Sequence, residues 1–137
     1  MKKSISIITS VRNCRTETEE YLNSLIKFAP KNLIEKFIVD DGSDPETQKF
    51  LASKSSDFTL MRNLQSRGFA FSNNLAASKA KSEWLLFLNN DLVLLEGWWD
   101  SYDSLISGGD NLSKIGCVGN VQVDPVTGKN RSCRCNI

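Results

Sequence analysis

Three polar side chains interrupt an apolar run at residues 84–95, which has the sequence WLLFLNNDLVLL. Asn89, Asn90 and Asp91 come directly after a segment that is otherwise typical of a buried strand. Mg²⁺ and Mn²⁺ prefer oxygen ligands and commonly combine one or two protein carboxylates with substrate phosphates. Amides can hydrogen-bond a sugar or order metal-bound water. Taken alone, the stretch fits a plain turn, because Asn and Asp favour turns. If a phosphorylated ligand binds, Asp91 is suited to hold its metal, and the metal site is the alternative interpretation.

A pair of adjacent carboxylates, Asp40 and Asp41, ends a second apolar segment, in the stretch FIVDDGS. Neighbouring carboxylates repel each other unless a donor or a cation lies close by, so the pair favours a role in binding. Asp40 could accept hydrogen bonds from a base or a ribose. A turn followed by a helix cap is the alternative interpretation of this stretch.

Glycine-rich phosphate loops are absent from the sequence. There is no GxxxxGK[ST], and the early loop TSVRN has no glycine, so the GxGxxG pattern also fails. A phosphorylated ligand would then need a metal and arginine side chains to neutralise its charge. Gly68 would allow close approach of the backbone to a ligand, and Arg67 could pair with phosphate or serve as an ordinary surface charge.

Apolar periodicity indicates that strands and helices alternate along the chain. Strands are predicted at residues 4–9, 37–39, 58–61, 83–88 and 115–123. Helices are predicted at residues 16–29, from Pro45 behind an Asp44 cap, at 67–81 and at 96–107, the first opened by a capping box of Thr16 and Glu19. This order predicts an α/β fold with a mostly parallel sheet and helices on both faces. The polar clusters at Thr9–Arg12, Asp40–Asp41 and Asn89–Asp91 would then share the carboxyl edge of the sheet, where such folds bind ligands.

Composition limits the classes of protein that fit. The chain has 137 residues, 40% of them hydrophobic and 24% charged, which suits one globular domain. A net charge of +1 gives no electrostatic signature for nucleic acid. No signal-peptide core or membrane-spanning run is present, so we expect a soluble, cytoplasmic chain. The four cysteines form no CxxC and there is no histidine, so free thiols are favoured over a zinc site.

The quoted motifs together resemble the nucleotide-binding half of family 2 glycosyltransferases. The resemblance covers about residues 4–128, through ISIITSVRN, KFIVDDGSDPETQKFL, RGFAFSNNLAASKAKSEWLLFLNNDLVLLEGWW and IGCVGNVQV. It implies the GT-A fold, a Rossmann-like sheet. It also implies transfer of a sugar from a UDP- or dTDP-linked donor, with Mg²⁺ or Mn²⁺, by a hexosyl- or rhamnosyltransferase-like enzyme. Acceptors would be a glycan, a lipid or a protein, typically in cell-wall or polysaccharide biosynthesis, at a cytoplasmic or membrane-peripheral location.

The resemblance also implies roles for individual residues. Thr9 and Arg12 match the first loop of the donor pocket, and Asp40 and Asp41 match the pair that contacts base and ribose. The remaining donor contacts by this matching are Arg67, Gly68, Asn73, Asn89 and Asn90. Asp91 matches the metal ligand of an Asp-x-Asp-type motif in which Asn89 replaces the first acid. The metal would stabilise the diphosphate as leaving group.

The C-terminal end departs from the family pattern. No acidic residue follows Asp124, so we expect the general base of the second half to be absent and the fold to be incomplete there. We divide the chain into a donor-binding domain at 1–128 and an atypical tail at 129–137 with no strand pattern. One inserted adenine would turn codons for Lys-Ile-Asp-His-Ala-Gly-Val-Ile into those of residues 129–136, so we expect a frameshifted end, with a natural short tail as the alternative.

Other functions fit the sequence less well. The absent base makes a non-catalytic nucleotide- or sugar-binding module the main alternative to a transferase. A receiver-like signalling domain normally has its acid pair after the first strand, and a sugar nucleotidyltransferase would have a glycine-rich early loop. An open sheet without its second half would also expose apolar surface and favour self-association.

Overall fold

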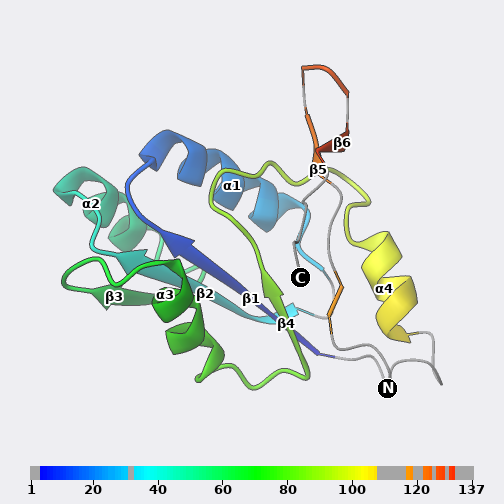
Figure 1. The fold of residues 1–137 in the computed structure, drawn as a ribbon, viewed down its shortest axis with the longest axis horizontal. Coiled ribbons are helices and arrows are strands. Elements are labelled where there is room, and N and C mark those ends of the chain that lie inside the picture. Colours follow the sequence, from blue (N-terminus) through cyan, green and yellow to red (C-terminus); the bar gives the residue numbers. More distant parts are fainter. Residues whose placement is uncertain are drawn as a thin grey trace. The chain divides into compact units, whose positions relative to one another are not determined.

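The computed structural model describes residues 4–30, 33–107, 117–118, 122–124, 126–128 and 130–131. Strands and helices alternate through residue 107, as the sequence predicts (Figure 1). Their bounds are β1 Ile5–Val11, α1 Arg15–Lys27, β2 Leu33–Asp41, α2 Pro45–Ser53, β3 Thr59–Asn63, α3 Phe69–Ala77, β4 Trp84–Phe87 and α4 Asp100–Ser107.

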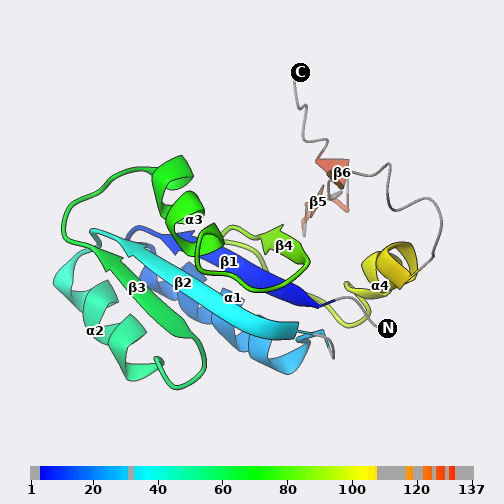
Figure 2. The same ribbon diagram turned by 90° about the horizontal axis from the view of Figure 1, so that it is seen from below.

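The four strands form one parallel sheet in the order β3-β2-β1-β4. Helices α1 and α2 cover one face of this sheet and α3 covers the other (Figure 2). The α/β prediction with helices on both faces is therefore confirmed. Because the strands are parallel, the ends of β1, β2 and β4 meet at one edge of the sheet.

Side chains of the central strands alternate between the two faces, as strand geometry requires. On β1, Ile7 and Val11 pack with α1 and α2, whereas Ile8 packs with α3. On β2, Ile38 belongs to the first core and Val39 to the second. This alternation decides which polar side chains at the carboxyl edge can share a site.

Two local predictions have different outcomes. Asp44 caps α2 as predicted, since its carboxylate accepts the Thr47 N–H at 2.8 Å with Pro45 as the first helical residue. The capping box of Thr16 and Glu19 is wrong, because α1 begins at Arg15 behind Cys14, which has left-handed backbone angles and no side-chain cap.

The strand β4 is less buried than its apolar sequence predicts. Within the described residues it is the last strand on its side of the sheet, and Leu85 and Phe87 are 39% and 46% exposed. These two side chains pair in register with Ser6 and Ile8 of β1, so they lie on the α3 side of the sheet.

Contacts divide the chain into two compact units, residues 1–107 and 108–137. In the second unit, β5 Gln122–Val123 pairs antiparallel with β6 Asn130–Arg131, so a short strand occurs in the tail where none was expected. Of the strand predicted at 115–123, only 117–118 and 122–123 belong to the described residues.

Candidate functional site

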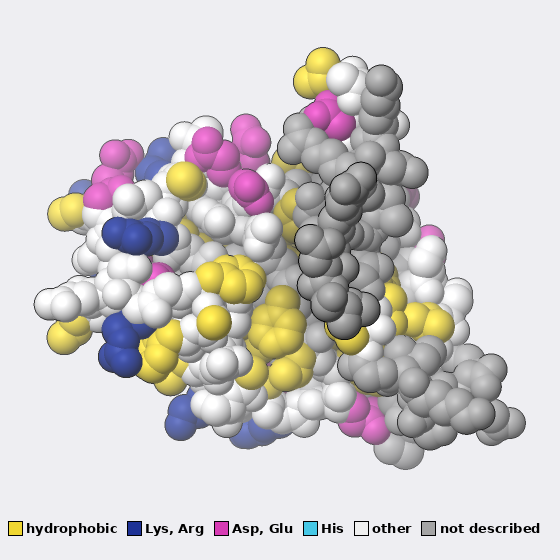
Figure 3. Space-filling model, viewed as in Figure 1, with side chains coloured by type: hydrophobic (Ala, Val, Ile, Leu, Met, Phe, Trp, Pro, Cys, Tyr) yellow, Lys and Arg dark blue, Asp and Glu magenta, His cyan; other side chains and the backbone are white. Residues whose placement is uncertain are grey.

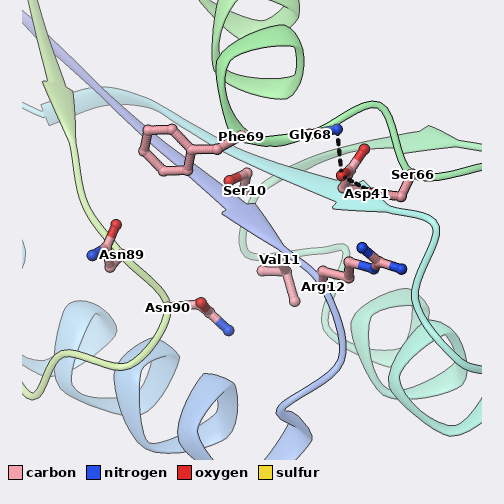
Figure 4. A pocket seen from close by; sticks show the side chains of 9 residues that line it. All are labelled: Ser10, Val11, Arg12, Asp41, Ser66, Gly68, Phe69, Asn89 and Asn90. Carbon is pink, nitrogen blue, oxygen red and sulfur yellow. Dashed lines mark hydrogen bonds between the residues drawn. The ribbon is translucent and has the colours of Figure 1, made fainter.

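A pocket of about 300 Å³ lies within the first unit, at the carboxyl edge of the sheet. It gathers residues from the ends of β1 and β2, the β3–α3 loop, the start of α3 and the segment after β4 (Figure 4). Its lining consists of Ser10, Val11, Arg12, Asp41, Ser66, Gly68, Phe69, Asn89 and Asn90. Its volume is at the lower end of the range of small-molecule sites.

At the end of β1, the structure separates two of the predicted donor contacts, Thr9 and Arg12. Arg12 is exposed and lines the pocket, together with Ser10. Thr9 is fully buried, and its hydroxyl lies 2.7 Å from the hydroxyl of Tyr21 on α1. Burial raises the pKa of Tyr21, so this phenol stays protonated. The structure thus brings Arg12 into the site and places Thr9 in the core between β1 and α1.

The acid pair Asp40–Asp41 is also divided between the two faces. Asp40 is fully buried on the α2 side, where it accepts hydrogen bonds from the Ser43 N–H at 2.9 Å and from Arg62 Nε at 2.7 Å. Asp41 lies on the α3 side and lines the pocket. The repulsion expected from their adjacency is relieved, because the two carboxylates point to opposite faces and each has donors of its own.

Asp41 is held by four hydrogen bonds. Oδ1 accepts from Asn63 Nδ2 at 2.7 Å and from the Arg67 N–H at 2.8 Å, and Oδ2 accepts from the Ser66 hydroxyl at 2.8 Å and from the Gly68 N–H at 2.9 Å. Burial disfavours the charged form, but these four donors outweigh it and hold the pKa of Asp41 well below its usual range. Asp41 is therefore ionised at neutral pH.

The β3–α3 loop contributes to the pocket mainly through its backbone, and the charged side chain of Arg67 is not part of the lining. Gly68 lines the pocket with φ of +86°, a conformation that favours glycine, and it directly precedes α3. Arg67 points elsewhere, since its guanidinium lies 4.0 Å from the centre of the Phe71 ring and is not part of the lining. Asn73 is buried one helical turn behind Phe69, outside the lining, and its amide has no hydrogen-bond partner among the described residues.

Asn89 and Asn90 form the other end of the pocket in Figure 4. Asn90 donates a hydrogen bond from Nδ2 to Thr18 Oγ1 on α1 at 2.8 Å, which fixes its side chain. Asp91 is exposed, lies next to the lining, and makes no hydrogen bond or ion pair with the described part of the chain.

The described residues contain no cluster of three or more His, Cys, Asp and Glu side chains that could hold a metal by itself. A lone free carboxylate beside two amides still fits Mg²⁺ or Mn²⁺, because these ions take the rest of their ligands from phosphate and water. Asp91 would hold such an ion, with Asn89 and Asn90 next to it.

Four lining residues, Ser10, Val11, Ser66 and Phe69, were not among the predicted site residues. Alternation along β1 could have indicated Ser10, which faces away from Thr9, but not Val11, which is on the same face as Thr9. Phe69 is 60% exposed in spite of its apolar ring, and a helical period cannot predict that. In Figure 4 its ring projects from the start of α3 toward the side of the pocket where Asn89 lies.

Comparison with protein families identifies the family of this chain. The family model "Glycosyl transferase family 2" matches residues 6–109. This chain belongs to glycosyl transferase family 2. The match runs from Ser6 in β1 through α4 and includes every pocket residue.

Two similar curated proteins are glycosyltransferases whose roles are uncharacterized. One, from Haemophilus influenzae, is 36% identical over 89 residues, which cover 64% of this chain and 29% of that protein. The other, from Mycoplasma genitalium, is 32% identical over 98 residues, which cover 64% of this chain and 32% of that protein. The matched part of this chain thus spans about a third of the length of these relatives.

Solved glycosyltransferase structures share the GT-A fold with this chain. S. aureus TarS, residues 1–349 in complex with UDP-GlcNAc, has a TM-score of 0.66 at 25% identity, covering 77% of this chain and 31% of that one. The mannosyltransferase PcManGT from Pyrobaculum calidifontis, in complex with GDP-Man and Mn²⁺, has a TM-score of 0.64 at 22% identity, covering 80% of this chain and 33% of that one. The predicted family and fold are therefore confirmed.

Proposed function

We propose that this chain binds a nucleoside diphosphate sugar, UDP- or dTDP-linked, as the donor for transfer to a glycan, lipid or protein acceptor. The observation that carries the proposal is the pocket at the carboxyl edge of the sheet. There an exposed arginine and a glycine backbone stand at one end, and two amides with an adjacent free carboxylate stand at the other. The donor-bound states of TarS and PcManGT, which have the same fold, support it.

The residues divide between the parts of such a donor by their chemistry. Arg12 can form paired hydrogen bonds with phosphate oxygens, and Gly68 lets the backbone come close to the ligand. Asn89 and Asn90 offer both donors and acceptors to sugar hydroxyls. For Arg67 and Asn73, donor contact stays a prediction, as the side chain of Arg67 lies over Phe71 and Asn73 lies behind the lining.

We propose Asp91 as the protein ligand of Mg²⁺ or Mn²⁺. When bound, the ion would neutralise charge on the diphosphate and so favour its departure. Arg12 would add a positive charge that needs no metal, since a guanidinium is always protonated. More specifically, we propose that the enzyme transfers a hexosyl or rhamnosyl group in polysaccharide or cell-wall biosynthesis. Its location would be cytoplasmic or membrane-peripheral. No helix of the described residues has the length and hydropathy to cross a membrane.

Calorimetric titration with UDP, dTDP and GDP, each with and without Mn²⁺, tests donor binding directly. We expect UDP or dTDP to bind more tightly than GDP, and Arg12→Ala to weaken that binding about tenfold. Lys49→Ala is the matched control, because Lys49 carries the same charge on the exposed surface of α2 outside the pocket. If a folded chain binds none of the three nucleotides, the proposal fails.

A non-catalytic nucleotide- or sugar-binding module is the second candidate. The replacement of the first acid of the motif by Asn89 favours it, because a single carboxylate holds a metal less tightly than two. Incubating the chain with UDP-sugars and Mn²⁺ and measuring released UDP separates the two functions. Binding of the UDP-sugar without transfer of the sugar to an acceptor or to water, and so without released UDP, would favour the module.

We also propose that the chain self-associates through apolar surface at β4. Figure 3 shows hydrophobic side chains gathered over α3 and β4. The exposed members on β4 and at the start of α3 are Leu85, Phe87 and Phe69. An edge strand with exposed apolar side chains tends to associate. Sedimentation should show a concentration-dependent oligomer that Phe87→Ser weakens, and a monomer at all concentrations would contradict this.

A further inference from the structure

Three hydrogen bonds fasten the segment after β4 to α1 and to Phe28, the residue that ends this helix. In each of them a group of the segment is the donor. The pairs are Asn90 Nδ2 with Thr18 Oγ1 at 2.8 Å, the Leu94 N–H with Ser24 Oγ at 3.0 Å and Trp98 Nε1 with the Phe28 carbonyl at 2.9 Å. Of the three donor residues, Asn90 is the one that lines the pocket. The bond between Asn90 and Thr18 therefore joins α1 to the pocket directly.

Thr18 can only accept a hydrogen bond from Asn90. Its side chain is fully buried on α1, and its hydroxyl donates to the Cys14 carbonyl one helical turn back, at 2.8 Å. A threonine hydroxyl carries one proton and two acceptor lone pairs, so the bond to Cys14 uses its proton. The hydroxyl thus requires a donor from Asn90, which the Nδ2 end of the amide supplies and the Oδ1 end cannot.

The bond to Thr18 decides which end of the Asn90 amide remains for a ligand. The two ends of an asparagine amide have nearly the same shape, and the hydrogen bonds around them determine their orientation. Nδ2 is directed to α1, and Oδ1 accepts no hydrogen bond from the described residues. Figure 4 shows Asn90 between the pocket and α1, so the acceptor end is the one left for the pocket. Asn89 next to it is exposed and makes no hydrogen bond within the described residues, so its amide can present either end.

We propose that Thr18 is a positioning residue, which fixes the amide of Asn90 with its nitrogen on α1 and its oxygen toward the donor. Asn90 then acts as a hydrogen-bond acceptor for a hydroxyl of the nucleoside diphosphate sugar, on its ribose or on the transferred sugar. The proposal rests on the proposed function and deepens it, since it assigns Asn90 one of the two bonding roles that an amide can have. It also gives α1, which has no residue in the pocket lining, a role in recognition of the donor.

Affinities for UDP and for a UDP-sugar test the acceptor role. The UDP-sugar used is whichever of UDP-glucose, UDP-galactose and UDP-GlcNAc binds the wild type most tightly. We expect Thr18→Val, which has the same shape without the hydroxyl, to weaken the UDP-sugar about fivefold to tenfold, because the released amide no longer keeps its oxygen toward the ligand. Equal weakening of UDP assigns the hydroxyl to the ribose, whereas loss of the affinity that the sugar adds assigns it to the transferred sugar. Affinities within twofold of the wild type for both ligands would overturn the proposal.

Two variants separate positioning from a general structural effect. Thr18→Ser keeps the hydroxyl and should bind both ligands within twofold of the wild type. Ser24→Ala is the matched control, because Ser24 on the same helix also donates to a backbone carbonyl, that of Tyr21 at 2.8 Å, and accepts from the segment after β4. Its partner Leu94 is outside the pocket lining, so the affinities should not change. No rescue by Thr18→Ser, or an equal loss in Ser24→Ala, would contradict the proposal.

Asn90→Ala tests whether Thr18 acts through Asn90. It removes the acceptor itself and should weaken the same ligand at least as much as Thr18→Val does. The double variant should bind as Asn90→Ala alone does, because the two residues act as one unit. Losses that add in the double variant would show that Thr18 affects the pocket by another route. A loss seen with Mn²⁺ and absent in chelator would show that Oδ1 binds the metal instead of a hydroxyl, and either result refutes the proposal.

NMR of the chain without ligand tests the orientation of the amide by itself. The side-chain NH₂ resonances of Asn90 are identified by their absence in Asn90→Ala. One of these protons should exchange slowly with water, and it should lose that protection in Thr18→Val but not in Thr18→Ser. The NH₂ protons of the exposed Asn89 give the unprotected reference. An unprotected Asn90 amide in the wild type would refute the positioning role, whereas a protected amide in a chain that binds neither UDP nor a UDP-sugar would refute only the proposed function.

Discussion

Asp41 and Asp91 stand at the same edge of the sheet, one at the end of β2 and one shortly after β4, but their surroundings are opposite. Asp41 is 4% exposed and accepts four hydrogen bonds. Asp91 is exposed and makes no hydrogen bond or ion pair with the described residues. Asp41 is therefore held by the protein, whereas Asp91 has no partner within the described residues.

The difference indicates that the two ends of the pocket are formed by different means. The end made by Asp41, Ser66 and Gly68 is built before any ligand arrives, because buried hydrogen bonds to a charged group hold it. The end at Asn89–Asp91 has one fixed side chain, Asn90, next to two exposed ones. A ligand with its metal would complete that end, so variants at the two ends should differ in what they disturb.

Removal of the two carboxylates should show the largest contrast in stability. Asp41→Ala leaves four donors without their acceptor, some of them buried, and should lower the free energy of unfolding by about 2–4 kcal/mol. Asp91→Ala should change it by less than about 0.5 kcal/mol, since nothing in the described structure depends on that side chain. Urea unfolding followed by circular dichroism measures both, and equal losses would show that the contrast is wrong.

Acid should weaken the folded state through Asp41. The pKa of Asp41 is lowered from the ordinary value of 3.8, so the unfolded chain takes up a proton first as the pH falls. The stability from Asp41 is fully present above about pH 4 and is lost as the pH falls through its lower folded pKa. Unfolding free energies measured from pH 6 to pH 2 should fall less steeply in Asp41→Asn than in the wild type. If the unfolding free energy depended on pH with the same slope in Asp41→Asn and in the wild type, the four donors would not stabilise the charge of Asp41.

Metal dependence should be confined to the other end of the pocket. Asp91→Ala should remove the part of UDP affinity that Mn²⁺ adds, about tenfold, and leave the affinity measured in chelator unchanged. Asp41→Asn should lower affinity in both conditions and keep the gain from Mn²⁺. Calorimetric titrations of the two variants in parallel test this, and loss of the Mn²⁺ effect in both would mean that the two ends act as one unit.

Short-range patterns in the sequence predicted most of the fold, because they reflect local rules. The alternation of strands and helices and the Asp44 cap depend on residues close in sequence, and both are confirmed. The start of α1 was predicted wrongly because contacts distant in sequence set it. The Asn13 side chain accepts the Asp44 N–H at 2.8 Å, and the Asn13 N–H reaches Ser43 Oγ at 2.9 Å. The turn after β2 thus holds the chain just before Cys14.

The candidate site shows the same limit at the level of single residues. Sequence motifs brought together Arg12, Asp41, Gly68, Asn89 and Asn90, all of which line the pocket. They could not show that the donors to Asp41 come from 22 to 27 positions further along the chain. Such pairings depend on how β2, β3 and α3 are assembled, and no spacing in the sequence records them.

Thr9 provides the smallest test, because it was expected in the donor pocket and lies in the core. Its hydroxyl pairs with Tyr21 in a buried site, so Thr9→Val should lower the free energy of unfolding by about 1 kcal/mol. The affinity for UDP should stay within about twofold, because Thr9 is fully buried and is not part of the pocket lining, to which this part of the chain contributes Ser10, Val11 and Arg12. Tyr21→Phe removes the partner hydroxyl, and the double variant should cost less than the sum of the two single losses, because they share one hydrogen bond. A tenfold loss of UDP affinity in Thr9→Val would show that Thr9 belongs to the donor site.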